Sequence, residues 1–167
     1  METTARLYST TYNEARTYIM AALFIVGNIV LPQLCHTIPQ GGHIFLPIYF
    51  FTLVGAYKYG WRVGLLTAML SPIANHLLFG MPPSAALPSI LVKSTALAVA
   101  AAFVARRSGN GSLLAVAAAV AAYQLVGSLA EWAMTGSIAA AMQDITLGLP
   151  GIALQVFGGY AVLKWLQ

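Results

Sequence analysis

The chain has 167 residues, of which 59% are hydrophobic and only 7% are charged, and its net charge is +4. A soluble domain carries about 25% charged residues to keep its surface in water. The composition therefore excludes an ordinary soluble protein, predicts a lipid bilayer as the surroundings of a single domain, and gives no reason to expect a nucleic-acid partner.

The polar segment 1–16 comes first in the chain. It lacks the apolar stretch and the small-residue cleavage site of a secretory signal, so we interpret it as a retained cytoplasmic segment. It is also a candidate for an amphipathic helix on the membrane surface. Residues 17–167 are expected to form the membrane domain.

Six apolar segments follow, separated by Gly, Pro and charged residues. Each helix that crosses a hydrocarbon core about 30 Å thick needs about 20 mostly apolar residues. The second segment is short, with Pro47 near its start, and its bounds are the least defined. The sequence predicts an all-α integral membrane protein, a bundle of six transmembrane helices at 17–34, 45–58, 60–79, 84–105, 112–134 and 145–166.

Basic residues predict the orientation of the bundle, because cytoplasmic loops retain Lys and Arg. With the N-terminus inside, seven of the eight basic residues fall in cytoplasmic segments, and the outer loops near 35–44, 80–83 and 135–144 contain none. Both termini are therefore expected to be cytoplasmic. The eighth, Lys93, comes ten residues after Pro83, which places it about 15 Å deep, near the bilayer midplane.

Polar side chains inside the segments gather in the outer half of the bilayer. Such groups normally face another helix or a watery cavity, and the inner halves are mainly Ala, Leu, Val and Gly. This asymmetry predicts a pocket that opens outward, whereas a conducting pore needs polar lining along its whole length. The residues expected to form the pocket are Asn28, His36, Gln40, His43, Asn75, Lys93, Gln124, Glu131, Trp132, Asp144 and Gln155.

Several of these residues have a simpler explanation. Polar groups within helices also serve as hydrogen bonds between helices, and Trp132 has the place of an interfacial aromatic as well as of a side chain that stacks on a flat ligand. Lys93 and Glu131 are alternatively counter-ions, although their depths differ by roughly two turns, which argues against direct contact. In the pocket hypothesis, Lys93 pairs with an anionic or carbonyl group, and Glu131 or Asp144 accepts a hydrogen bond from an amine or ring N–H.

No motif in the sequence predicts an enzyme, a cofactor or a metal site. There is no G-x-x-x-x-G-K-[ST] loop for nucleotide phosphates and no G-x-S-x-G or His-Glu-x-x-His motif. The three histidines and the lone Cys35 lack the tight spacing of metal ligands. Neither catalytic nor metal-ligating residues are therefore expected.

Two stretches resemble the substrate-binding S components of energy-coupling factor (ECF) vitamin transporters. Residues 46–65 combine a proline-containing helix with the turn GAYKYGWRVGL, and residues 148–155 read GLPGIALQ, which is similar to the opening of the family's last helix. The six segments, the cytoplasmic termini, the long first outer loop and the chain length also match the family.

The resemblance implies a subunit of the bacterial or archaeal cytoplasmic membrane that captures a vitamin or related small organic micronutrient from outside. Delivery inward then requires a transmembrane T component and two ATPase subunits, which use the ATP. The family's docking motif Ala-x-x-x-Ala has its nearest equivalents in Thr17 and Ala21, and the N-terminal histidine motif of nickel and cobalt members is missing.

Two other function classes remain open at this point. A self-contained secondary carrier of a small organic solute usually has paired broken helices in repeated halves, which are not evident here. A non-catalytic membrane assembly protein would bind another protein without capturing a small molecule.

Overall fold

The computed structural model describes residues 10–108 and 112–166, so most of the predicted N-terminal segment lies outside the described residues. The regular structure of the described part of the chain is all helical, with no strand. Its elements are α1 (Ala15–Cys35), α2 (Gly41–Phe45), the 3-10 helix η1 (Pro47–Tyr49), α3 (Phe50–Tyr59), α4 (Trp61–Phe79), α5 (Leu87–Ser108), α6 (Leu113–Thr135), α7 (Ile138–Ala141), α8 (Gln143–Thr146), α9 (Leu149–Ala153), the π-helical η2 (Leu154–Gly158) and α10 (Gly159–Trp165).

Each predicted segment coincides with one helix or one continuous helical run. The long runs are α1, η1 with α3, α4, α5, α6, and α9 through α10. Three of them, α1, α5 and α6, are long and apolar enough to cross a membrane. These helices indicate a membrane protein built as a helix bundle.

Backbone conformation explains where two of the runs begin. Leu46 adopts φ 47° and ψ 46°, a left-handed conformation that ends α2, and Pro47 then starts the next helical run. Gly60 adopts φ 91° between α3 and α4, a conformation that glycine takes without steric cost. Because Pro47 starts it, the run formed by η1 and α3 begins two residues later than the predicted segment 45–58.

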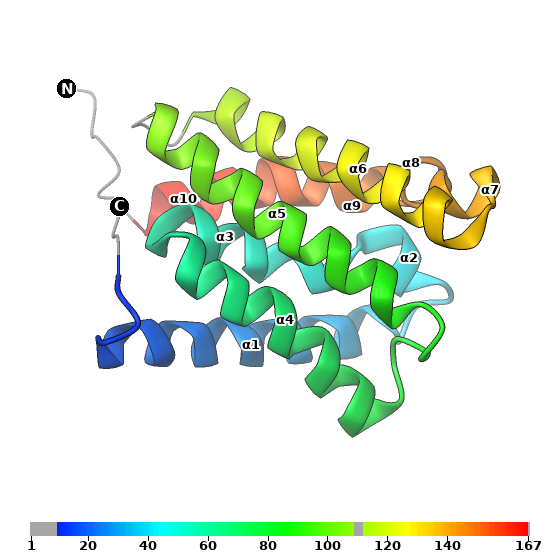
Figure 1. The fold of residues 1–167 in the computed structure, drawn as a ribbon, viewed down its shortest axis with the longest axis horizontal. Coiled ribbons are helices and arrows are strands. Elements are labelled where there is room, and N and C mark those ends of the chain that lie inside the picture. Colours follow the sequence, from blue (N-terminus) through cyan, green and yellow to red (C-terminus); the bar gives the residue numbers. More distant parts are fainter. Residues whose placement is uncertain (1–9, 109–111, 167) are drawn as a thin grey trace.

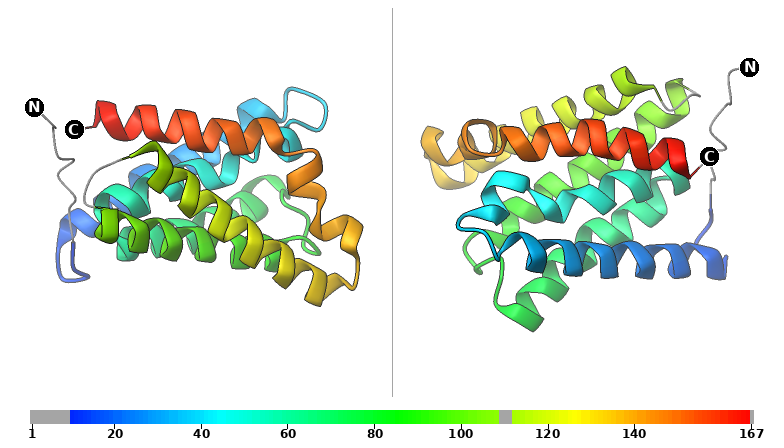
Figure 2. Two further views of the ribbon diagram at one scale, coloured as in Figure 1. Left: turned by 90° about the horizontal axis from the view of Figure 1, so that it is seen from above. Right: turned by 180° about the vertical axis from the view of Figure 1, so that it is seen from behind.

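The long helices lie side by side with their axes roughly aligned (Figure 1). Helix α5 packs against α6 and α4, and α3 packs against α4, α5 and α1. The start of α1 and the end of α10 lie at one end of the bundle, whereas α2, α7 and α8 lie at the other (Figures 1 and 2). We call these the terminal end and the loop end.

Small apolar side chains fill the half of the bundle near the terminal end. Ala98 and Ala101 of α5 are fully buried, as is Ala119 of α6. Helices α3 and α4 approach so closely that a Cβ on Gly64 would lie 2.4 Å from the Cβ of Ala56. Close approach through small residues is the usual packing of helices in lipid. Buried polar side chains also occur near this end, among them Thr17 and Lys58, and both are hydrogen-bonded to backbone carbonyls.

The structure corrects the prediction that Thr17 and Ala21 form a docking surface. Both are buried, on the same face of α1 as Phe24 and Asn28, and Thr17 Oγ1 donates a hydrogen bond to the carbonyl of Thr11. Residues three or four apart share one face of a helix, and this face of α1 packs on the bundle. Thr17 and Ala21 thus stabilise the fold and offer no surface to a partner.

Candidate ligand-binding cavity

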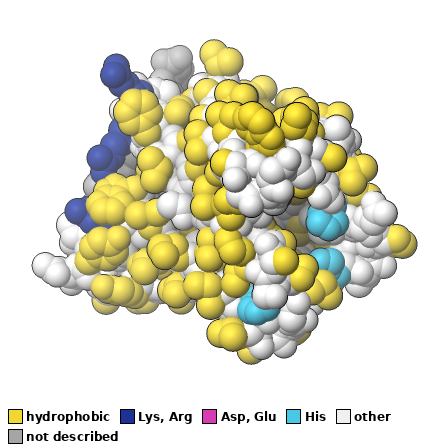
Figure 3. Space-filling view, turned by 45° about the vertical axis from the view of Figure 1, so that its right-hand side comes forward, with side chains coloured by type: hydrophobic (Ala, Val, Ile, Leu, Met, Phe, Trp, Pro, Cys, Tyr) yellow, Lys and Arg dark blue, Asp and Glu magenta, His cyan; other side chains and the backbone are white. Residues whose placement is uncertain are grey.

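A cavity of about 360 Å³ lies at the loop end of the bundle. Its walls come from the end of α1, from α2 and η1, from the 81–86 loop, and from the parts of α4, α5, α6 and α8 that meet there. Small-molecule sites have volumes of roughly 300–1,000 Å³. In Figure 3, His side chains lie on the hollowed loop end, and Lys and Arg side chains gather at the terminal end.

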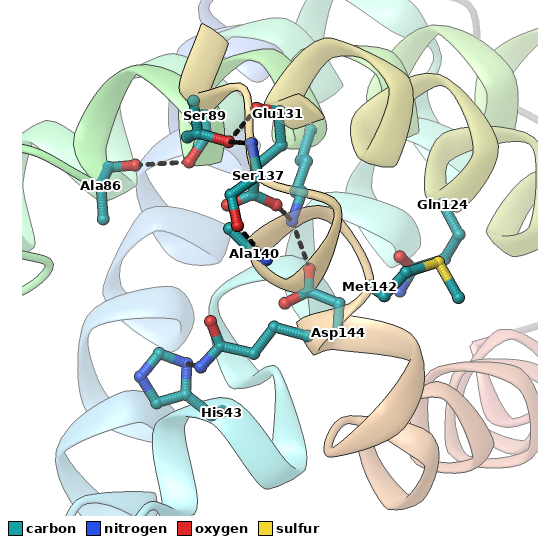
Figure 4. Close-up of polar contacts among 12 residues, drawn as sticks. His43, Ala86, Ser89, Gln124, Glu131, Ser137, Ala140, Met142 and Asp144 are labelled. Atoms are coloured by element: carbon teal, nitrogen blue, oxygen red, sulfur yellow. Dashed lines mark hydrogen bonds and ion pairs between the residues drawn. The ribbon is translucent and has the colours of Figure 1, made fainter. Parts of the chain in front are cut away.

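Three charged side chains meet at the wall of this cavity. Lys93 of α5 forms ion pairs with Glu131 of α6 and with Asp144 of α8, and its Nζ lies 2.8 Å from Asp144 Oδ2 (Figure 4). The lysine side chain is only 3% exposed, whereas the Glu131 and Asp144 side chains are 16% and 11% exposed. The group carries one excess negative charge, and it ties three elements together.

The direct contact between Lys93 and Glu131 corrects the depth argument from the sequence. Residues 84–86 form a turn, so α5 begins at Leu87 and not at residue 84. Lys93 is then six residues, about 9 Å, into its helix, and Glu131 is four residues, about 6 Å, from the end of α6. The two side chains thus lie at similar depth, and the counter-ion interpretation is the one that the structure supports.

Gly127 of α6 makes room for the lysine. A Cβ at this position would lie 2.5 Å from Lys93 Cγ and 3.3 Å from Lys93 Cδ, which is closer than packed atoms approach. The stem of Lys93 therefore crosses the backbone of α6 to reach both carboxylates. The sequence analysis missed Gly127, although it shares a helical face with Gln124 and Glu131.

The loop-end rim of the cavity carries further polar groups. His43 of α2 and Gln143 of α8 are joined by a hydrogen bond of 3.4 Å between Nδ1 and Nε2. His76 Nδ1 donates to the carbonyl of Pro82, a lining residue, over 2.7 Å and holds the 81–86 loop against α4. These contacts shape the opening from segments that are distant in sequence.

Seven of the eleven predicted pocket residues line the cavity. They are His36, Gln40, His43, Asn75, Lys93, Glu131 and Asp144. Gln143, Ser89 and Tyr49 also line it, and the sequence analysis did not include them among the pocket residues. The only sequence signal for Gln143 was its position beside Asp144.

Asn28 lies below the cavity and holds three helices together. Its Nδ2 donates to Thr52 Oγ1 and Ser71 Oγ, at 3.0 and 3.1 Å, and its Oδ1 accepts from the Phe51 backbone N–H. Asn75 Nδ2 donates to the Asn28 carbonyl over 2.8 Å. Because its side chain is fully buried and satisfied, Asn28 fits the alternative role of hydrogen bonding between helices.

Gln124 and Gln155 also lie outside the cavity, in a network around Tyr123. The Tyr123 hydroxyl donates to Gln155 Oε1 over 2.8 Å and accepts from Gln124 Nε2 over 3.0 Å. Tyr49 lines the cavity, and its ring centroid is 5.4 Å from that of Tyr123. The two glutamines therefore belong to the interior behind this ring pair.

Trp132 does not line the cavity and is 49% exposed. Adjacent residues on an α-helix point about 100° apart, so a helix that aims Glu131 at the cavity turns Trp132 sideways. This position matches the interfacial alternative.

Among the described residues, no group of three or more His, Cys, Asp or Glu side chains is arranged to hold a metal ion. Of the two histidines that line the cavity, His43 is hydrogen-bonded to Gln143. The chemistry that the cavity offers is hydrogen bonding and charge.

Comparisons of the chain with protein-family models, with curated proteins and with solved structures found no significant match. The functional argument therefore depends on the fold and on the cavity.

Proposed function

We propose that this chain is the substrate-binding S component of an ECF-type importer in the cytoplasmic membrane of a bacterium or archaeon. It captures a vitamin or related small organic micronutrient from outside and delivers it inward together with a T component and two ATPase subunits. The observation that carries the proposal is the cavity at one end of the bundle, lined in part by Lys93, Glu131 and Asp144, next to a half that is packed largely with apolar side chains.

The six long helical runs support a bundle that crosses the membrane six times. α4 has 19 residues and the run from α9 to α10 has 17, which correspond to about 28 and 25 Å of helix. Both lie alongside the three apolar helices, and η1 with α3 completes the set (Figure 2). In the proposed arrangement, both chain ends are cytoplasmic.

The distribution of charge supports the direction of the cavity. Arg62, Arg106 and Lys164 lie in or beside segments of the terminal end, where Figure 3 shows basic side chains gathered. The positive-inside rule assigns this end to the cytoplasm. The cavity then opens to the outside, as capture of an external nutrient requires.

The packing of the terminal half favours a receptor over a self-contained passage. Val63, Leu97 and Val116 are fully buried there, and the cavity with its charged lining lies at the other end. A passage through this half would need rearrangement of the core, and the sequence has no Walker motif to drive it. The proposal therefore assigns the energy to partner ATPases.

Co-purification tests the proposal. The tagged chain is co-expressed with the T component and ATPases of its own genome, extracted in mild detergent, and analysed for bound proteins and ATP-dependent uptake in vesicles. We expect a stable complex and uptake that stops with an ATPase-dead partner. Gradient-driven uptake by the chain alone would favour the secondary carrier, and an unrelated protein complex without uptake would favour the assembly protein.

A further inference from the structure

We infer that the cavity recognises a small planar ligand with a cationic nitrogen group, bound by the free oxygens of Glu131 and Asp144. The inference rests on the proposed function, namely that this cavity captures a small molecule. It reverses the role expected for Lys93, which in the structure belongs to the protein's own charge balance.

Lys93 has little capacity left for an anionic ligand. An ammonium group has three N–H donors, and two of them are directed to Glu131 and Asp144. Lys93 lines the cavity, but its side chain is only 3% exposed, whereas the Glu131 and Asp144 side chains are 16% and 11% exposed. An anion in the cavity would therefore meet more carboxylate surface than ammonium surface.

The carboxylates, in contrast, keep accepting capacity on the cavity side. Each uses one oxygen for Lys93, and in the described part of the chain neither Glu131 Oε1 nor Asp144 Oδ1 accepts a hydrogen bond. Both side chains remain partly exposed where they line the cavity. Both carboxylates bind the same nitrogen atom, so the two groups lie side by side at the cavity wall, and the inference places one cationic group against both.

The charge balance of the site favours a cation. Two carboxylates face one ammonium, so the site carries one excess negative charge, and the other titratable side chains of its lining are His36, His43 and Tyr49. An uncompensated charge away from water is costly. A cationic ligand removes the excess, whereas an anionic ligand increases it.

The remaining walls fit a flat ring. Pro32, Pro47 and Pro83 line the cavity together with Ile48, Ile90 and Tyr49, which supply apolar surface away from the carboxylates. A planar ring with a nitrogen cation at one edge satisfies both parts of the lining. A flexible aliphatic polyamine would leave much of the apolar wall in contact with water.

Three nearly isosteric probes test this inference on the purified chain in detergent. Benzamidine is a planar cation, benzamide is its neutral counterpart and benzoate is the anion. Binding of each is measured by isothermal titration and by the shift in thermal unfolding. We expect benzamidine to bind with a Kd of about 1 mM or lower and at least about tenfold more tightly than benzamide, and benzoate to bind most weakly.

Substitutions of the two carboxylates test whether benzamidine binds at this site. Asp144→Asn and Glu131→Gln keep the size and shape of the side chains and remove the negative charge. Each variant should weaken benzamidine binding at least about tenfold and reduce the preference for benzamidine over benzamide. Glu14→Gln removes the same charge from the start of α1, at the terminal end, and should change neither the affinity for benzamidine nor the preference over benzamide. If a carboxylate variant fails to fold, the order of affinities of the three probes for the unaltered chain still tests the inference.

The inference is overturned if benzoate binds best, if benzamidine binds no better than benzamide, if no benzamidine binding is detected, or if the carboxylate variants leave binding unchanged. The probe experiment needs no partner subunits, so its failure is separate from that of the proposed function. A complex with a T component and ATPases, found without benzamidine binding, would retain the function and reject the ligand class.

Discussion

Lys93 Nζ lies 2.8 Å from Asp144 Oδ2, although 51 residues separate the two positions in the sequence. The contact ties the middle of the bundle to the short α8 above it, and Glu131 completes the group from α6. The lysine therefore sets the position of both carboxylates that face the cavity.

Replacing Lys93 should be strongly destabilising. Lys93→Met removes the only ammonium that contacts Glu131 and Asp144 in the described structure and leaves two largely buried carboxylates with like charge. Breaking a buried pair in this way costs about 3–5 kcal/mol, which thermal unfolding in detergent will measure. Lys164→Met, an exposed position at the terminal end, is the matched control and should change stability by less than about 0.5 kcal/mol. Equal stability of the two variants would show that the ion pairs contribute nothing to the fold.

Gly127 should not tolerate a side chain. In Gly127→Ala, the new Cβ would lie 2.5 Å from Lys93 Cγ, so the lysine stem must move and its two ion pairs must lengthen. Overpacking of this kind costs about 1–3 kcal/mol, and the altered carboxylates should also weaken benzamidine binding.

A comparison variant for this prediction is Gly158→Ala, where the nearest atom is the terminal methyl Cδ1 of Leu154 at 3.2 Å. That methyl group can yield, so the cost should be smaller and probe binding should not change. A Gly127→Ala protein with unaltered stability and binding would contradict the close crossing of Lys93 over α6.

The network around Tyr123 should matter for stability and not for ligand binding. Tyr123→Phe leaves Gln124 Nε2 and Gln155 Oε1 without their partner in a buried region, at a cost of about 1–3 kcal/mol. Thermal unfolding and benzamidine titration on the same sample separate the two effects. Tyr18→Phe, at a 52% exposed position, serves as the control. If Tyr123→Phe weakens benzamidine binding without a change in stability, Gln124 and Gln155 act in ligand binding and the prediction is wrong.

The direction of the cavity can be tested by cysteine labelling in intact cells. In a Cys35→Ser background, His43→Cys at the cavity rim and Arg106→Cys at the terminal end place single exposed thiols at opposite ends of the bundle. A membrane-impermeant maleimide should label the first in intact cells and the second only after permeabilisation. The reverse pattern would mean that the cavity faces the cytoplasm and would contradict capture from outside.

The sequence predicted the helical segments well because their punctuation is local. Gly60 separates α3 from α4 where the pattern indicated, whereas the run of η1 and α3 begins at Pro47, two residues after the predicted start. The start of α5 was wrong because Ser84, Ala85 and Ala86 suit a helix by composition, whereas Ala86 N–H and Leu87 N–H both bond to the Pro83 carbonyl in a turn. This difference of one turn misplaced Lys93.

Only part of the site was predicted, because the sequence indicates the depth of a residue in the bundle better than the direction of its side chain. Depth in the bundle follows from position along the segment, so most polar residues near the loop end reached the cavity. Rotation of each helix about its own axis depends on its neighbours and is not set by one sequence stripe. Asn28 was therefore directed to α3 and α4, and Gln124 to the hydroxyl of Tyr123. Gly127, which has no side chain, gave no signal for its role beside Lys93.

Native mass spectrometry of the chain purified from its own host tests the central claim most directly. Our account predicts that the unaltered chain carries a small organic molecule in addition to lipid and detergent, and that Asp144→Asn loses it while Glu14→Gln retains it. An unaltered chain that carries only lipid and detergent, or an Asp144→Asn variant that retains the molecule fully, would contradict a receptor built on this cavity.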